Sequence, residues 1–189
     1  SAPRAAELLA TAGEHEALVR FSRSLGVPRP LPDLLGMSIR VVDAYGPDSH
    51  QDFLLVTSVD LPVLHHMFVP ARGVDQRPYS SSIPYRAGDE TFLVGTVPRS
   101  EQEFDLAVSA MSGRFTSVGR IEIGERLTDT LDALRFNPFN TGGGMAPVGV
   151  LNGMRARAYP MSQKAWGAAQ SGGTAAQQAA ETALRAEFR

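Results

Sequence analysis

Short segments of alternating polarity, separated by turn residues, are the feature that most constrains the fold of this chain. In residues 37–42, apolar side chains alternate with serine and arginine, which is the period of a half-buried strand. Residues 45–48, Tyr-Gly-Pro-Asp, then turn the chain, and an apolar strand resumes at 51–56, so we predict a hairpin. The predicted strands of one antiparallel β-barrel are 17–21, 37–42, 51–56, 91–97 and 114–123.

Helical patterns lie between and after these strands. Residues 100–103 have the Ser-x-x-Glu pattern of a capping box. Phe104, Val108 and Met111 then recur at helical spacing, so we predict a helix that buries this apolar face. The alanine-rich segment 174–189 is composed mostly of good helix formers, and we predict a second helix there.

The predicted fold class is therefore α+β, a closed antiparallel β-barrel with flanking helices that include a short one at 3–10. Residues 1–170 are expected to form the barrel domain, and residues 171–189 a C-terminal helical tail behind a flexible Ser-Gly-Gly link. Two roles are open for this tail: loose packing against the domain, or pairing with another subunit in a homodimer.

Composition and charge exclude several functional classes. Lysine plus arginine number 18 against 20 aspartates plus glutamates, and the basic residues are spread along the chain, so nucleic acid is not an expected partner. No run reaches about 18 apolar residues, and residues 1–12 lack the pattern of a signal peptide. We therefore expect no membrane partner and a cytoplasmic location. Because cysteine is absent, any metal must be held by oxygen or nitrogen ligands.

Arg20 is the first candidate binding residue, because it is a charged side chain within an otherwise apolar strand. Ser22 follows two residues later and so lies on the same face of that strand. Two interpretations are open: the arginine extends along the surface to water, or it binds an anionic group of a small-molecule ligand.

Arg155 and Tyr159 are the second candidate pair, since residues four apart lie on the same face of a helix. A guanidinium and a ferric ion next to the phenol would favour its ionisation, and tyrosinate is a known axial ligand of haem iron. The alternative is a structural pair on the surface.

The order and neighbours of these residues resemble the catalase-like superfamily, in particular its short bacterial members. The matching segments are Val19–Ser22 (Val-Arg-Phe-Ser), Asp33–Val41 ("D-x-x-G-x-A-h-K-h", with h apolar), Gln51–Val56 ("D-h-h"), Val118–Ile121, Leu134–Phe139 ("L-x-F-N-P-W"), and Leu151–Ser162, which contains "R-x-x-x-Y".

The resemblance implies a closed eight-stranded barrel with haem beside it. Transferred residue by residue, it implies Tyr159 as the axial ligand of the haem iron, Arg155 as the residue that stabilises its phenolate, and Arg20 in an ion pair with a haem propionate. The expected activity is haem-dependent oxidoreductase chemistry, a weak peroxidase reaction on an organic hydroperoxide.

The chain also departs from that family at the distal residues. His15 is too close to Arg20 to match the distal histidine, and the distal asparagine position falls among residues 57–59, Thr-Ser-Val. Without a general base near a bound peroxide, cleavage of the O–O bond loses a factor of about 10² to 10⁴. Efficient catalase activity is therefore not expected.

Two alternatives remain open at this stage. The chain could be a haem-free scaffold of the same kind, acting as a small-molecule-binding or interaction module. It could also be a piece of a longer enzyme whose preceding strand carries the distal histidine. His65 and His66 are adjacent and so cannot chelate one metal from a strand, and residues 141–144, Thr-Gly-Gly-Gly, lack the lysine of a phosphate-binding loop.

Overall fold

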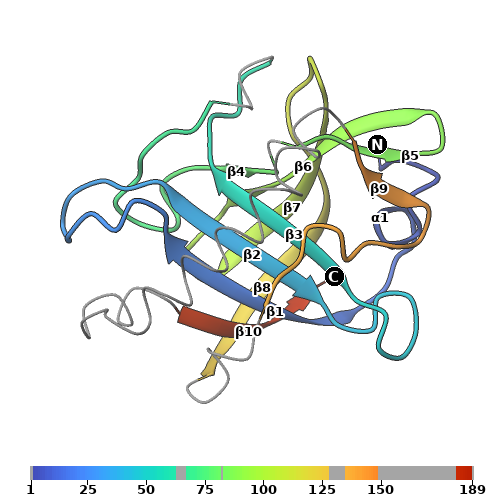
Figure 1. Cartoon of the computed structure of the whole chain (residues 1–189), viewed down its shortest axis with the longest axis horizontal. Coiled ribbons are helices and arrows are strands. Elements are labelled where there is room, and N and C mark those ends of the chain that lie inside the picture. Colours follow the sequence, from blue (N-terminus) through green and yellow to red (C-terminus); the bar gives the residue numbers. More distant parts are fainter. Residues whose placement is uncertain (1, 63–66, 82, 128–134, 149–181, 189) are drawn as a thin grey trace.

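The computed structural model describes residues 2–62, 67–81, 83–127, 135–148 and 182–188. These residues form one antiparallel sheet of ten strands and one helical turn (Figure 1). The elements are α1 (Glu7–Ala10), β1 (His15–Arg23), β2 (Leu35–Val41), β3 (Gln51–Thr57), β4 (Tyr79–Ser80), β5 (Tyr85–Ala87), β6 (Glu90–Pro98), β7 (Glu103–Ala110), β8 (Thr116–Leu127), β9 (Met145–Pro147) and β10 (Thr182–Phe188).

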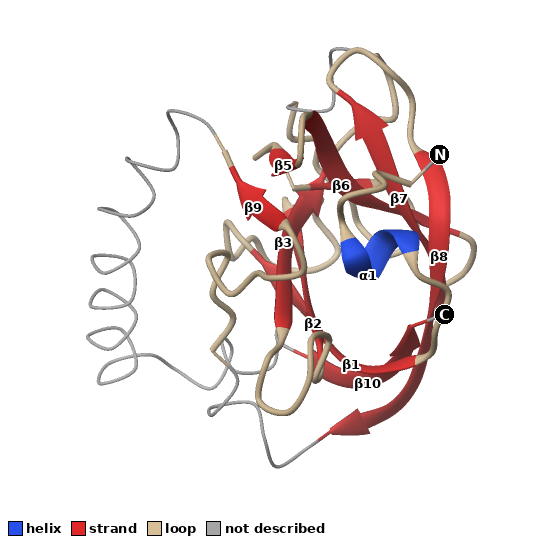
Figure 2. Cartoon of the chain, turned by 90° about the vertical axis from the view of Figure 1, so that its right-hand side faces the viewer, coloured by secondary structure: helices blue, strands red, loops and turns tan. Residues whose placement is uncertain are grey.

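The strand order is β4-β3-β2-β1-β10-β8-β7-β6-β5-β9, and the short strand β4 also pairs with β6. The sheet curves around the interior, with α1 inside the curve (Figure 2). Only two residue pairs, Tyr79–Thr96 and Ser80–Gly95, join β4 to β6, and the sheet is otherwise open, with β9 at one end of the strand order. Among the described residues, no helix is long and apolar enough to cross a membrane.

Strand alternation builds the core. Val19 on β1 faces Ile39 on β2, and Ile39 faces Phe53 on β3, so one inward row crosses three strands. All three side chains are buried. Full burial of an aliphatic or aromatic side chain contributes about 1.5–3 kcal/mol to the free energy of unfolding. Burial of this row therefore favours the pairing of β2 with β1 and with β3.

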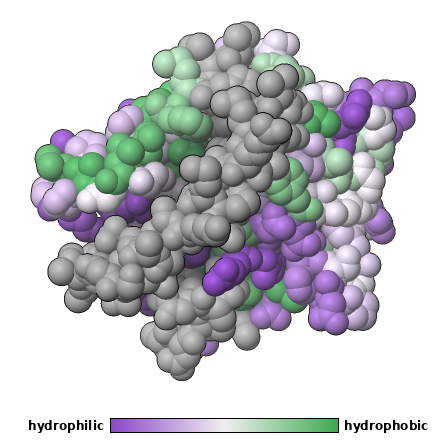
Figure 3. All heavy atoms as spheres, in the orientation of Figure 1, coloured by the Kyte–Doolittle hydropathy of each residue, from purple (hydrophilic) through white to green (hydrophobic). Residues whose placement is uncertain are grey.

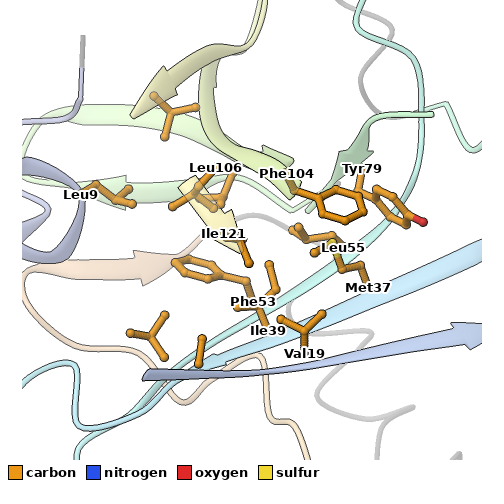
Figure 4. Close-up of a cluster of buried hydrophobic side chains, with 14 of the residues drawn as sticks. Leu9, Val19, Met37, Ile39, Phe53, Leu55, Tyr79, Phe104, Leu106 and Ile121 are labelled. Atoms are coloured by element: carbon orange, nitrogen blue, oxygen red, sulfur yellow. The ribbon is translucent and has the colours of Figure 1, made fainter. Parts of the chain in front are cut away.

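Aromatic side chains fill the other side of the interior (Figure 4). The ring of Phe104 lies 5.8 Å from that of Phe21 and 6.4 Å from that of Tyr79, measured between centroids. The largest fully buried side chains are Tyr79, Phe53, Phe104, Met37, Ile39, Leu55, Leu93, Leu106, Ile121, Gln51 and Val19. The inner face of the sheet is thus occupied by the protein's own side chains.

The five predicted strands are confirmed as parts of one antiparallel sheet, because they overlap β1, β2, β3, β6 and β8; the predictions at 37–42 and 114–123 extend one and two residues beyond β2 and β8. The predicted fold class is wrong: the structure is nearly all β, the sheet does not close into a barrel, and the described residues contain no flanking helices. Of the predicted helix at 3–10, the structure retains one turn, α1.

The predicted helix after residues 100–103 is also wrong, since this segment forms β7. Ser100 and Glu103 instead close the β6–β7 hairpin, where the backbone N–H groups of Arg99 and Ser100 donate to the Glu103 carbonyl. Phe104 and Val108 are four residues apart, a spacing that fits a strand face as well as a helix face. Both are buried as predicted, but Met111 lies beyond the strand and is exposed.

The predicted C-terminal helix is wrong at residues 182–188, which form β10 between β1 and β8. The remainder of that segment, 174–181 and 189, lies outside the described residues. Alanine favours a helix locally by less than about 1 kcal/mol per residue, and strand pairing on two sides overrides such a preference. Part of the predicted tail is therefore an internal strand of the sheet.

Candidate functional site

Arg20 lies on the outer face of β1, opposite to the inward-facing Val19 and Phe21. Arg20 pairs with Ser38 and Leu18 pairs with Arg40, so the two arginines are diagonal neighbours on one face of the sheet. The guanidinium carbons of Arg20 and Arg40 lie 5.0 Å and 5.4 Å from the centroid of the Phe136 ring. We call Arg20, Arg40, Asp52 and Phe136 the arginine–aromatic cluster.

Asp52 provides the negative charge of this cluster and is fully buried. It stands directly opposite Arg40 in the β2–β3 ladder. Arg40 Nε donates to Asp52 Oδ1 and Arg40 Nη2 donates to Asp52 Oδ2, both at 2.7 Å, which is the bidentate geometry of a strong charge-assisted pair. The hydrogen bond to Asp52 raises the pKa of Arg40 above its ordinary value, so the guanidinium stays charged.

The segment from Arg135 to Asn140 docks onto this ion pair. The Asn137 N–H donates to Asp52 Oδ2 at 2.8 Å, and Arg40 Nη2 donates to the Arg135 carbonyl at 2.7 Å. Between these two anchors, the Phe136 side chain is buried against Leu18, Leu54 and Leu127. The polar contacts therefore fix the segment while the ring covers the arginines.

Sequence reasoning identified Arg20 but missed Arg40 and Asp52. A signal for that pair was present, because the predicted hairpin of 37–42 and 51–56 places Arg40 and Asp52 on facing strands, where opposite charges attract. No comparable local signal links Phe136 to Arg20, since the two residues come from distant parts of the chain.

The expected haem contacts are not brought together by the described residues. Arg20 is described, and its guanidinium lies against an aromatic ring of the chain itself. Arg155 and Tyr159 lie outside the described residues, so their assignment stays a prediction. The guanidinium carbon of Arg20 lies 5.0 Å from the centroid of the Phe136 ring, a cation–π distance. Of the three predicted haem contacts, the described residues therefore include Arg20 alone.

The segment expected at the distal asparagine position is buried. Thr57 Oγ1 accepts a hydrogen bond from the Leu35 N–H at 3.1 Å. The Ser58 hydroxyl is also buried and has no hydrogen-bond partner among the described residues. Neither side chain presents an amide toward a ligand, as the family's asparagine would.

The glycine run of residues 141–144 has a packing role. A Cβ atom on Gly143 would lie 2.2 Å from Cε1 of Tyr45, and one on Gly142 would lie 2.7 Å from its Cδ2. The Tyr45 hydroxyl donates to Gln51 Oε1 at 2.9 Å. Burial raises the pKa of Tyr45 to about 12. The glycines therefore allow the backbone to lie flat on a half-buried tyrosine ring.

Beside the arginine–aromatic cluster there is a small apolar hollow with room for about one water molecule. Its lining residues are Leu54, Ser81, Ile83, Tyr85, Pro138, Phe139 and Pro147. The Ser81 hydroxyl donates to the Ile83 carbonyl at 2.7 Å, so it already has a partner. The hollow offers apolar contact and no convergent set of charged groups.

A second distinctive surface lies at one end of the sheet. The β1–β2 connection carries Leu25 and Leu31, which are 64% and 55% exposed, and the β3–β4 connection carries Met67 and Phe68, which are 54% and 46% exposed. We call these four residues the apolar loop end. In Figure 3, apolar atoms gather over this part of the molecule, at the left of the view. The sequence pattern had marked residues 24–35 only as a proline-rich connection.

Among the described residues, no group of three or more histidine, aspartate or glutamate side chains is placed to hold a metal ion. His65 and His66 lie outside the described residues. Comparison of the chain with protein-family models, curated proteins and solved structures finds no match.

Proposed function

We propose that this chain is a haem-free binding or interaction module built on a curved antiparallel sheet. The observation that carries the proposal is the position of Phe136 over both guanidiniums of the arginine–aromatic cluster. Arg40 is neutralised by Asp52, and the ring covers Arg20. Arg20, the residue predicted to hold a haem propionate, thus packs against a ring of the chain itself.

The surface that remains for recognition is apolar. The apolar loop end presents carbon-rich side chains to solvent on two neighbouring connections. Such surfaces bind apolar ligands, proteins or lipids because apolar surface is removed from water, and they do not require a catalytic reaction on the bound partner. We place this function in the cytoplasm, as expected from the sequence, and subcellular fractionation tests that location.

A catalase-related haem protein is the second candidate, and one observation favours it. Segments that resemble the family motifs meet in space: β1 carries Arg20, β2 and β3 carry Arg40 and Asp52, and the Phe-Asn-Pro segment binds across all three strands. In this proposal, Arg20, Arg155 and Tyr159 hold the haem, which would supply weak peroxidase chemistry on an organic hydroperoxide.

An absorption titration with haem distinguishes the two candidates. For the haem-free module, we expect no Soret band beyond that of free haem in buffer. For the haem protein, we expect a saturable Soret band that disappears in Tyr159→Phe. The matched control is Tyr45→Phe, which also removes one phenolic oxygen, from a half-buried tyrosine bonded to Gln51. A saturable band in the wild type would refute the haem-free proposal.

A further inference from the structure

We propose that the apolar loop end docks on the surface of an anionic lipid bilayer, in place of the expectation from the sequence that the chain has no membrane partner. This inference rests on the proposed role as an interaction module and names its partner. Membrane binding at this end requires three properties: protruding apolar side chains, a loop that is already ordered, and positive charge beside it. The described residues supply each of them.

The apolar side chains protrude from two neighbouring connections. Leu25 and Leu31 follow β1, and Met67 and Phe68 follow β3. Each is about half exposed or more, although leucine, methionine and phenylalanine are among the residues that proteins bury most often. Side chains of this kind insert about 5–10 Å into the headgroup region of a bilayer.

A buried carboxylate orders the first connection. Asp33 accepts hydrogen bonds from the N–H groups of Leu25 and Val27, each at 3.0 Å. The Arg23 guanidinium lies 3.5 Å from Asp33 and donates to the Leu31 carbonyl at 2.8 Å. The two leucines are therefore held outward by bonds to their own backbone, so that little conformational entropy remains to be lost on docking.

The second connection is tied to the first. The Asp33 N–H donates to the Ala71 carbonyl and the Ala71 N–H donates to the Asp33 carbonyl, both at 2.9 Å. A further bond runs from the Val69 N–H to the Thr57 carbonyl at 3.0 Å. Met67 and Phe68 lie just before these anchors, so the four apolar residues lie on described segments that backbone hydrogen bonds join to each other and to β3.

On the described parts of the two connections, the exposed charges are mainly positive. Arg29, Arg72 and Arg77 are exposed on the two connections, and Asp75 is the exposed carboxylate among the described residues there. Asp33 is buried against Arg23 and adds no free negative charge to the surface. Arginines beside an apolar patch are attracted to the anionic headgroups of a cytoplasmic leaflet.

The same charges argue against a second copy of the chain as the occupant. A two-fold dimer places the same patch on both subunits, so the arginines of one copy, Arg29, Arg72 and Arg77, would face those of the other across one interface. Like charges across an interface oppose association, whereas an anionic bilayer neutralises them. The surface therefore fits a lipid headgroup layer better than itself.

Co-sedimentation of the full chain with sucrose-loaded vesicles tests the proposal. One vesicle population is phosphatidylcholine alone, and the other contains about one-third phosphatidylglycerol. We expect binding to the anionic vesicles that weakens when salt screens the arginines. Leu25→Ser with Leu31→Ser should lower the partition coefficient at least about tenfold, because two inserted side chains are lost. Met67→Ser with Phe68→Ser should have a similar effect.

Phe139→Ser is the matched control, since Phe139 is 44% exposed but lines the hollow with Leu54 and Tyr85 and belongs to neither connection of the loop end. It should bind vesicles like the wild type. Circular dichroism checks that every variant is folded. Three outcomes would each overturn the proposal. The wild-type protein could stay in the supernatant, or the loop variants could still sediment with the vesicles. The molar mass of the wild type in solution could also double with rising concentration and return to that of one chain in the loop variants. The haem titration is independent of these outcomes, so the two proposals fail separately.

Discussion

Replacement of Asp52 by asparagine should reveal how strongly the arginine–aromatic cluster stabilises the fold. The substitution keeps an oxygen that accepts the Asn137 N–H, but it removes the charge that pairs with Arg40. Loss of one partner from a buried ion pair costs about 3–5 kcal/mol, because the other charge stays desolvated. The Arg40 side chain keeps 18% of its exposed area, so we expect the lower end of that range, about 3 kcal/mol.

Urea denaturation followed by circular dichroism measures this loss, with the m-value unchanged if the transition stays two-state. Asp105→Asn is the matched control: Arg99 makes the same bidentate contact with Asp105, but the Arg99 side chain is 55% exposed. This control should lose much less stability. The double variant Arg40→Met with Asp52→Asn should be more stable than Asp52→Asn alone, because no unpaired charge remains. Equal losses in Asp52→Asn and Asp105→Asn would refute the reasoning.

Three further perturbations test the packing. Phe104→Ala should cost about 3–5 kcal/mol in a urea titration because the ring is fully buried, whereas Met111→Ala, at a 38% exposed site, should cost less than about 0.5 kcal/mol. Gly143→Ala should lower the free energy of unfolding more than Gly26→Ala. Both glycines have positive φ, but only at Gly143 would a Cβ atom clash with Tyr45. Equal losses of stability would contradict the contact between Gly143 and the tyrosine ring. Burial raises the pKa of Tyr45 from 10 to about 12, so the folded state favours the neutral phenol. The contribution of Tyr45 to the free energy of unfolding is therefore complete below pH 10 and is lost as the pH rises to about 12. After a discount for partial exposure, the loss should be about 1 kcal/mol, and Tyr45→Phe should reduce it; an unchanged pH slope in that variant would exclude Tyr45 as the source.

The strands could be predicted because their signal is local. In β2, apolar residues alternate with serine and arginine along the sequence itself, residues 53–56 of β3 are a short apolar run, and the turn at 45–48 sets the hairpin. Residues 104–108 were ambiguous because a four-residue spacing fits both periods. Only the neighbours β6 and β8, which pair with β7 on both sides, decide between them. For β10, pairing with β1 and β8 likewise outweighs the helical preference of its alanines.

The candidate site was less predictable than the strands for a related reason. A charged residue in an apolar strand marked Arg20, but its aromatic partner comes from a segment far along the chain. Contacts of this kind depend on how the chain returns to the sheet, which no local pattern encodes. Arg40 and Asp52 were within reach of sequence reasoning, since they face each other across a hairpin whose strands were identified.

The arginine–aromatic cluster and the apolar loop end differ in whether their side chains find partners within the chain. At the arginine–aromatic cluster, the Asp52 carboxylate accepts from Arg40 and from the backbone of Asn137, and Phe136 is buried between the arginines and leucines. Groups whose interactions are completed within the chain contribute to its stability. At the apolar loop end, the buried pair Arg23–Asp33 completes the polar bonds of the backbone, while the leucines beside it remain in water. Exposed apolar area held on an ordered loop lowers the free energy only when another surface covers it. The loop end is therefore the part of this molecule where a binding partner has most to contribute.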